Sequence, residues 1–357
     1  MHHFTKRSFL FCCIASLYAC SDSDKAGSTL STQVHQHGDG ELHSHGDQSE
    51  FVVDWLAQFE SESIIGTPHI VDCKLSGGTE TSCVSITLKP APAKMTIGPW
   101  CPRNISDGPE KSGIWLESGK VYDADGDFIK NLATFYKDDK WLMFDAVTGA
   151  VNVTDTKISC EAAARPDVDP EYQNYCVECQ VSYMDKGASN TYVIPIESIK
   201  AAEPSRNVGF SGVGIAFSGA RFDASAPTHA ILAAHTLAPF DDCGGHVNLH
   251  AGYHIHAVTG ECLKSVAVEQ DHAAAIGIAM DGFPLHNRLN LDGTLAVDLD
   301  QCGGHEFGEL GYHYHVAEPG KNAIIACHVG EVGCALDNDS ALCDASARPA
   351  RPPRPPR

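Results

Sequence analysis

The chain has 357 residues, a length that favours two domains and leaves room for a substantial hydrophobic core. Charged residues make up 20% and hydrophobic residues 43%, which is typical of a globular protein and not of a disordered one. The 25 Lys and Arg stand against 46 Asp and Glu, so the net charge is −21. Because phosphate binding needs clustered basic residues, this charge argues against a nucleic-acid partner. The 19 His and 15 Cys are high counts and direct attention to metal sites and disulfides.

The first residues have the pattern of an export signal. Residues 1–19 combine a basic start with a short apolar run, Ser8 to Ala19, which is shorter than the roughly 20 residues that span a bilayer. Leu17, Ala19 and Cys20 resemble a bacterial lipobox, whose cysteine is acylated after cleavage. Ser21 is not the Asp that would retain a lipoprotein at the inner membrane. We therefore expect an exported protein, an outer-membrane lipoprotein facing the periplasm or the cell surface, whose only membrane contact is a lipid anchor at Cys20; simple secretion is the alternative.

The cysteines that follow Cys20 number twelve, and an even number in an exported chain predicts disulfides. Cys73 and Cys83 flank a Ser-Gly-Gly turn and could close a hairpin, and Cys334 and Cys343 could close the last ordered loop. The spacing of Cys176-Val-Glu-Cys179 also occurs in redox and zinc sites, but its surroundings lack a βαβ pattern, so we expect a structural role. The rest of the connectivity stays open at this stage.

Residues 20–50 are predicted to form a flexible tether, since they hold almost nothing that could be buried. His35, His37, His43 and His45 lie in this tether among acidic residues. Such a tract can collect Zn²⁺, Cu²⁺ or Ni²⁺ weakly, or it can be a polar spacer.

Residues 51–200 are predicted to form a β-rich domain, introduced by a short helix near Phe51–Phe59. Short runs of alternating apolar and polar residues predict strands at 84–88, 128–132, 141–144 and 192–196. Residues 123–127, Asp-Ala-Asp-Gly-Asp, resemble the start of a calcium loop, but Thr134 stands where an EF-hand needs a bidentate Glu. We therefore expect a hairpin turn there.

Residues 201–330 are predicted to be internally duplicated. The sequence Gly214-Ile-Ala recurs at Gly277 at an offset of 63, and Cys243-Gly-Gly-His recurs at Cys302 at an offset of 59. Gly252-Tyr-His-Ile-His recurs at the same offset of 59 as Gly311-Tyr-His-Tyr-His. Two copies of about 60 residues suggest two pseudo-symmetric halves around one core. A Cys-bounded cap at 331–343 and a disordered Pro/Arg tail at 344–357 follow.

These motifs resemble a known family. Cys302-Gly-Gly-His305, then Tyr312-His313-Tyr314-His315, with Asp281-Gly-Phe-Pro before them, are similar to the YHYH domain of bacterial secreted proteins. The resemblance covers about residues 190–330 and departs in the first copy, where Ile255 replaces the second Tyr. It implies a domain type and no particular activity. The predicted fold class is mainly β, with the β-rich domain followed by the duplicated domain and disulfides stabilising both.

The paired histidines point to a metal site. In a strand, side chains alternate between faces, so the two His of each His-X-His share one face. If the two halves pack about a pseudo-twofold axis, the pairs can converge on one ion. Each copy adds the His of its Gly-Gly-His motif and one more possible ligand four residues later. The predicted metal ligands are His246, His250, His254, His256, His305, Glu309, His313 and His315.

The alternative to a metal site is a polar core in which these imidazoles are hydrogen-bonded. Thiolate-free, His-rich ligation outside the cell favours Zn²⁺ or Cu²⁺. Asp281 is expected to form a turn, or to orient a ligand His. Histidines outside the motifs could surround the site or lie on the surface: His229, His235, His272, His286 and His328.

Three functions fit the sequence: a metal-binding lipoprotein, a metal-dependent hydrolase of unknown substrate, and a structural or adhesive surface protein without metal. The sequence holds no nucleophile elbow, phosphate loop, dinucleotide fingerprint or His-Glu-X-X-His motif. Whether the protein is an enzyme therefore stays open at this stage.

Overall fold

The computed structural model of the protein describes residues 34–36, 42–44, 54–165, 167–206, 212–260, 262–268, 272–336 and 342–347. The chain divides into two units, residues 1–50 and 51–357. In the first unit, β1 (Val34–Gln36) pairs antiparallel with β2 (Leu42–Ser44). The predicted signal peptide, the lipobox and residues 348–357 of the predicted tail lie outside the described residues, as do the side chains of the tether histidines.

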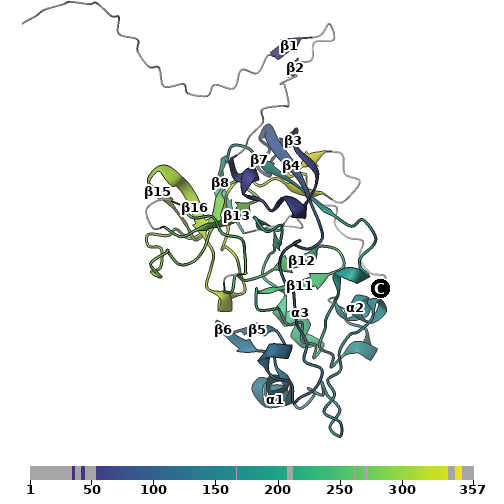
Figure 1. The fold of residues 1–357 in the computed structure, drawn as a ribbon. Coiled ribbons are helices and arrows are strands. Elements are labelled where there is room, and N and C mark those ends of the chain that lie inside the picture. Colours follow the sequence, from purple (N-terminus) through teal and green to yellow (C-terminus); the bar gives the residue numbers. More distant parts are fainter. Residues whose placement is uncertain are drawn as a thin grey trace, which may run out of the picture. The chain divides into compact units, whose positions relative to one another are not determined.

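An eight-stranded sheet organises the second unit (Figure 1). Four strands come from the first half of the predicted duplication and four from the second half. The strand order is β11-β12-β10-β9-β13-β14-β16-β15. The bounds are β9 (Gly214–Ala216), β10 (Arg221–Phe222), β11 (Gly245–Asn248), β12 (Gly252–Ile255), β13 (Ala275–Ala279), β14 (Pro284–His286), β15 (Gly304–Phe307) and β16 (Gly311–His315).

The two halves of the sheet have mirrored strand orders. From the edges to the centre, β11 corresponds to β15, β12 to β16, β10 to β14 and β9 to β13. At the centre, β9 pairs antiparallel with β13, and Ile215 lies opposite Ile278. These two residues are counterparts at the offset of 63. On either side, β10 runs parallel to β12 and β14 runs parallel to β16, with Phe222 opposite Ile255 and Leu285 opposite Tyr314. The equivalent registers are those that a twofold relation between the halves would produce.

This strand order keeps the two His-X-His motifs apart. The first motif begins in β12 and ends one residue beyond it, and the second ends β16. Strands β10, β9, β13 and β14 lie between β12 and β16. Five steps of about 4.8 Å between neighbouring strands separate the two motifs by roughly 24 Å. The prediction that the two histidine pairs meet in one site is therefore wrong, because the halves join through β9 and β13 and carry their histidines to opposite edges.

A five-stranded sheet packs against the central strands. Its order is β18-β7-β4-β3-β19, with bounds β3 (Ile64–Lys74), β4 (Glu80–Leu88), β7 (Asn190–Pro195), β18 (Cys334–Leu336) and β19 (Cys343–Asp344). Buried apolar side chains of β4 and β7 meet those of β9 and β13 in one cluster, which contains Ile86, Ile194, Ile215 and Ile278. Burial of this apolar surface holds the two sheets together.

The boundary expected near residue 200 does not divide the second unit, since residues 51–357 are one contact unit. Strands β4 and β7 from the predicted first domain share their sheet with β18 and β19 from the predicted cap. In addition, β8 (Lys200–Ser205) pairs with β17 (His328–Gly330) across the predicted second domain. The predicted domains and the cap are thus parts of one packed body.

A smaller layer, made by β5 (Ile114–Glu117), β6 (Lys120–Asp123) and α1 (Gly126–Tyr136), corrects two predictions. The strand predicted at 128–132 is helical, and residues 123–127, predicted to form a hairpin turn, connect the end of β6 to the first residues of α1. Asp125 caps this helix by accepting a hydrogen bond from the backbone N–H of Phe128. The buried Ile129 and Leu132 then face Trp115 in the core.

Of the other predicted elements, some are confirmed and some are wrong. The strands at 84–88 and 192–196 are present as β4 and β7, whereas residues 141–144 contribute only an isolated bridge between Phe144 and Val151. The helix expected near Phe51–Phe59 is a 3₁₀ turn over Asp54–Gln58. Two further short helices, α2 (Lys157–Ala163) and α3 (Thr228–Ala233), lie beside β11 and β12 and matter for the site below.

All twelve cysteines after Cys20 form disulfides. The two expected pairs are present, and Cys176 and Cys179 bond to different partners, which confirms their structural role. The pairs are Cys73–Cys83, Cys101–Cys176, Cys160–Cys179, Cys243–Cys262, Cys302–Cys327 and Cys334–Cys343. The mainly β, disulfide-stabilised fold class is therefore confirmed. Among the described residues, no helix is both long and apolar enough to cross a membrane.

Replacing both Cys101 and Cys176 with Ser should destabilise the protein more than the same change at Cys73 and Cys83. The sequence separations are 75 and 10 residues. Loop-closure entropy then gives about 4.5 and about 2.7 kcal/mol, respectively. Denaturant unfolding followed by circular dichroism measures both losses. All four cysteines are buried, so burial does not distinguish the two variants. Equal losses of stability in the two variants would therefore contradict this ranking.

Candidate metal centres

The second half of the sheet gathers four histidines at one edge. His305 on β15 lies directly opposite His313 on β16, so the two side chains share a face of the sheet. His315 is two residues further along β16 and points to the same face. His272, from the loop before β13, completes the group. We call His272, His305, His313 and His315 the four-His cluster.

The ring nitrogens of the four-His cluster converge. Nε2 of His272 lies 2.8 Å from Nε2 of His313 and 3.1 Å from Nε2 of His315. Nε2 of His305 lies 3.2 Å from Nε2 of each of the same two residues. Four nitrogens bound tetrahedrally to Zn²⁺ at about 2.0–2.1 Å would lie about 3.3–3.4 Å apart. The observed spacing is therefore close to that of a tetrahedral metal site.

The hydrogen bonds of the Nδ1 atoms show which ring nitrogens carry a proton. Nδ1 of His305 contacts the carbonyl of Val297 at 2.9 Å, and Nδ1 of His315 contacts the carbonyl of Asn287 at 2.9 Å. Nδ1 of His313 contacts the carbonyl of Gly311 at 3.1 Å. A carbonyl oxygen only accepts, so each Nδ1 carries the proton and each neutral ring presents an Nε2 lone pair to the centre. Lone pairs facing one another repel, and a cation between them removes that repulsion.

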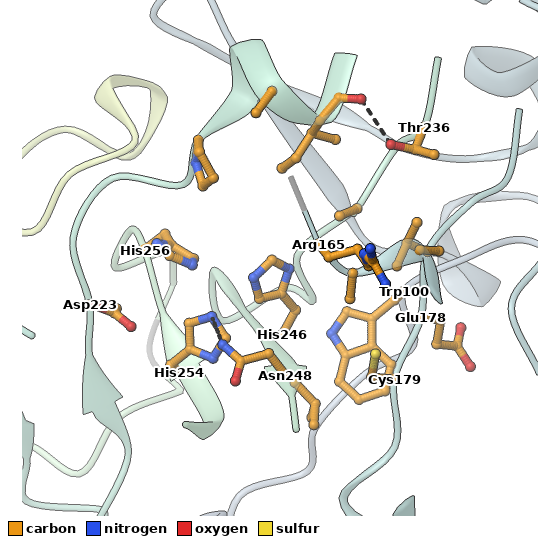
Figure 2. Close-up of a pocket in the computed structure, with 18 of the residues that line it drawn as sticks. Trp100, Arg165, Glu178, Cys179, Asp223, Thr236, His246, Asn248, His254 and His256 are labelled. Carbon is orange, nitrogen blue, oxygen red and sulfur yellow. Dashed lines mark hydrogen bonds between the residues drawn. The ribbon is translucent and has the colours of Figure 1, made fainter. Parts of the chain in front are cut away.

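The first half of the sheet builds a smaller version of the same arrangement. His246 on β11 lies opposite His254 on β12, and His256 follows two residues later. These residues can each place one ligand atom within 4.8 Å of the others, and we call them the three-His cluster (Figure 2). Nδ1 of His254 contacts the carbonyl of Gly252 at 2.9 Å, and Nδ1 of His256 contacts the carbonyl of Ala224. These contacts are the counterparts of those made by His313 and His315.

Burial favours the neutral form of several of these histidines. Burial lowers the pKa of His246 and of His313 to about 3 and the pKa of His315 to about 4. Burial also lowers the pKa of His254, and the neighbouring imidazoles add to the effect. Because a metal binds the neutral ring, these imidazoles are ready to ligate at pH 7 without losing a proton.

The Gly-Gly turns bring His246 and His305 to their places. Gly244 and Gly303 have φ of +81° and +89°, a region that side chains other than glycine disfavour. A Cβ on Gly245 would lie 2.6 Å from the hydroxyl of Tyr253, and a Cβ on Gly304 would lie 2.3 Å from the hydroxyl of Tyr312. The second glycine of each turn therefore leaves room for a tyrosine.

The tyrosines occupy the other face of β12 and β16 and fix the turns. The hydroxyl of Tyr253 donates to Asp241 at 3.0 Å, and that of Tyr312 donates to Asp300 at 2.8 Å. Asp300 also accepts from the backbone N–H groups of residues 302 and 304, and Asp241 accepts from those of 243 and 245. The His face of the motif thus gathers the imidazole nitrogens, and the Tyr face holds the turn that carries the third histidine.

Asp281 is fully buried and serves a tyrosine, not a ligand histidine. Its carboxylate accepts from the hydroxyl of Tyr314 at 2.5 Å and from the backbone N–H of Gly330 at 3.0 Å. In the first half, Ser218 and Ile255 stand at the positions of Asp281 and Tyr314. The departure from the Tyr-His-Tyr-His pattern is therefore matched by loss of the carboxylate that the second tyrosine needs.

Six of the eight predicted ligands lie in the two clusters. His250 and Glu309 do not: both are exposed, in the turns that connect β11 to β12 and β15 to β16. His272 was counted only among the outlying histidines, since it lies outside the repeated motifs. The repeat gives no signal for it, because Gly209 stands 63 residues earlier and the two halves differ at this position.

The remaining outlying histidines have other surroundings. His286 is buried beside His313, with ring centroids 4.3 Å apart, and its Nδ1 contacts the carbonyl of Ala273 at 2.6 Å. His328 is buried and contacts the carbonyl of Val213 at 2.9 Å. His235 pairs with Asp138 at 2.8 Å, and His229 is exposed.

Comparison with known proteins identifies one family. Residues 191–298 match the family model described as YHYH protein, which confirms the resemblance over that range. The matched segment contains the three-His cluster and ends before His305, His313 and His315. No curated protein and no solved structure matches the chain.

Replacing Tyr314 with Phe should lower the free energy of unfolding by about 1–3 kcal/mol, because the buried Asp281 carboxylate and the Val329 N–H would each lose a partner. The Tyr312→Phe variant is the matched control, since its hydrogen bond to Asp300 is exposed and water can replace the hydroxyl. Thermal and denaturant unfolding of both variants measures the difference. A loss for Tyr312→Phe as large as that for Tyr314→Phe would contradict this account.

Proposed function

We propose that the protein is an exported metal-binding protein that holds Zn²⁺ or Cu²⁺ at two separate histidine centres. The observation that supports this most directly is the convergence of four Nε2 atoms in the four-His cluster at 2.8–3.2 Å. Without a metal, each acceptor needs a donor, and the rings of His305, His313 and His315, whose Nδ1 atoms carry the protons, offer none to one another. A central cation would satisfy these three lone pairs at once and could also bind Nε2 of His272.

The choice of metal follows from the ligand type. Both clusters consist of imidazoles, and every described cysteine is in a disulfide, so no thiolate is available there. Imidazole nitrogen suits Zn²⁺ and Cu²⁺, whereas Ca²⁺ and Mg²⁺ prefer oxygen. Tetrahedral four-nitrogen ligation favours Zn²⁺ in the four-His cluster in particular. Four protein ligands would close that centre, which is the arrangement of structural sites.

Export and lipid anchoring belong to the same proposal. Six disulfides require an oxidising compartment during folding, and the signal-like start of the chain with Cys20 supplies a route and an anchor. We propose an outer-membrane lipoprotein that faces the periplasm or the cell surface. Its metal centres would then bind metal ions outside the cytoplasm.

Purified protein should contain two metal ions per chain. The His313→Ala/His315→Ala variant and the His254→Ala/His256→Ala variant should each retain one, and the combination of all four changes should retain none. Elemental analysis of protein loaded with Zn²⁺ and then dialysed measures this. The His69→Ala variant is the control, because His69 is exposed on β3 and outside both clusters. Two ions in the quadruple variant would exclude both centres.

The Cys20→Ser variant should lose membrane attachment. Expressed in a diderm bacterial host, the unaltered chain is expected in the outer-membrane fraction, and Cys20→Ser is expected in the soluble exported fraction or as uncleaved precursor. The Cys13→Ser variant is the matched control, since Cys13 lies inside the predicted signal peptide and is removed. Fractionation followed by immunoblotting distinguishes these results. Unchanged outer-membrane attachment of Cys20→Ser would disprove the anchor.

A further inference from the structure

The two histidine clusters differ in the number of ligands they provide. His272 supplies a fourth nitrogen to the four-His cluster, whereas the three-His cluster has no fourth member among the residues that the structure describes. In the sequence, Gly209 stands at the position of His272, and residues 207–211 include no His, Cys, Asp or Glu. A metal held by three protein ligands keeps one position for an exogenous ligand.

A pocket adjoins the three-His cluster. Its volume is about 530 Å³, within the range of small-molecule sites, and His246, His254 and His256 all line it. Figure 2 shows the three rings grouped at one side of this pocket, with Trp100 and Arg165 across from His256. The C-terminal end of α2 contributes Ala164 to the walls, and α3 contributes Ala230 and Ile231; the walls are largely nonpolar. The pocket therefore offers apolar surface next to the open side of the cluster.

The amide of Asn248 is fixed in an orientation that presents a donor to the cluster. Its Oδ1 accepts from the backbone N–H groups of His250 at 2.9 Å and Ala251 at 2.6 Å. Its Nδ2 therefore faces the other way and contacts Nε2 of His254 at 3.4 Å (Figure 2). In the second half, Phe307 takes this position and stacks on His272 with ring centroids 4.3 Å apart. The polar donor thus stands in the cluster that lacks the fourth histidine.

The carboxylates of the pocket wall are already paired. Asp223 lies 3.2 Å from Nε of Arg221, and Glu178 lies 2.7 Å from the guanidinium of Arg103. Three neutral imidazoles leave the full positive charge of a divalent ion uncompensated. An anion that enters the pocket would neutralise part of that charge, and the donor of Asn248 would favour an oxygen ligand.

We propose that the three-His cluster forms an open metal centre that binds a small organic carboxylate, with one carboxylate oxygen on the metal and near the Asn248 amide, and the nonpolar body of the ligand in the pocket against Ala230 and Ile231. This inference rests on the proposed metal binding. It assigns different tasks to the two centres: the four-His centre is closed by protein ligands, and the three-His centre exchanges ligands.

The test uses Co²⁺, whose visible absorption responds to a change in coordination. The His313→Ala/His315→Ala variant isolates the three-His centre, and the His254→Ala/His256→Ala variant isolates the four-His centre. Benzoate is the probe, and acetate is the control that lacks the nonpolar body. In the isolated three-His centre, benzoate should alter the spectrum and half-saturate at a concentration at least tenfold lower than acetate. The isolated four-His centre should not respond to either probe.

A variant that fills the pocket distinguishes ligand binding in the pocket from metal binding by the three-His cluster. Ala230→Trp should keep Co²⁺ and the response to acetate, and should weaken benzoate at least tenfold. Wild-type protein with both cobalt ions should show the benzoate response too, so the test does not depend on the folding of any variant. Failure to retain Co²⁺ in the three-His centre would overturn the proposed metal binding there. Bound Co²⁺ whose spectrum ignores benzoate, or an equal response of the four-His centre, would overturn this inference alone.

Discussion

The register of two hairpins is the constraint on which the candidate sites depend. His246 lies opposite His254, and His305 lies opposite His313, so each hairpin places two imidazoles on one face and a third two residues along. A slip of one residue would turn every histidine to the tyrosine face and every tyrosine to the histidine face. Asp241 and Asp300 accept hydrogen bonds from Tyr253 and Tyr312, respectively. These bonds connect the tyrosine face to the Gly-Gly turns and so prevent that slip.

The two faces of the motif therefore have separate tasks, and the halves of the sheet differ in both. On the histidine face, the second half has His272 and Phe307, and the positions that correspond to them in the sequence of the first half hold Gly209 and Asn248. On the tyrosine face, the second half keeps the pair of Tyr314 and Asp281, which the first half replaces with Ile255 and Ser218. One half is thereby a closed four-nitrogen cluster, and the other is a three-nitrogen cluster beside a pocket.

Tertiary packing overrode local patterns in the first 200 residues. Alternation correctly predicted β4 and β7, because both are buried in the sheet interface. The same reasoning failed at residues 128–132, since a helix of 11 residues offers few periods and the Asp-rich cap before it also resembles a turn. The expected boundary near residue 200 is bridged because β17, β18 and β19 return from the end of the described chain to pair with β8, β7 and β3.

The sequence by itself determined the chemistry: the paired histidines, the Gly-Gly turns, the repeated offsets, the resemblance to the YHYH family and the even set of cysteines. It also predicted that the two histidines of each His-X-His motif share one face, since the alternation of a strand is a local property. Only the tertiary structure decided that there are two clusters instead of one. Which strand edges meet depends on burial of Ile215 and Ile278 against the second sheet, a long-range packing that no local pattern encodes. The same packing brought His272 to one cluster and a pocket to the other.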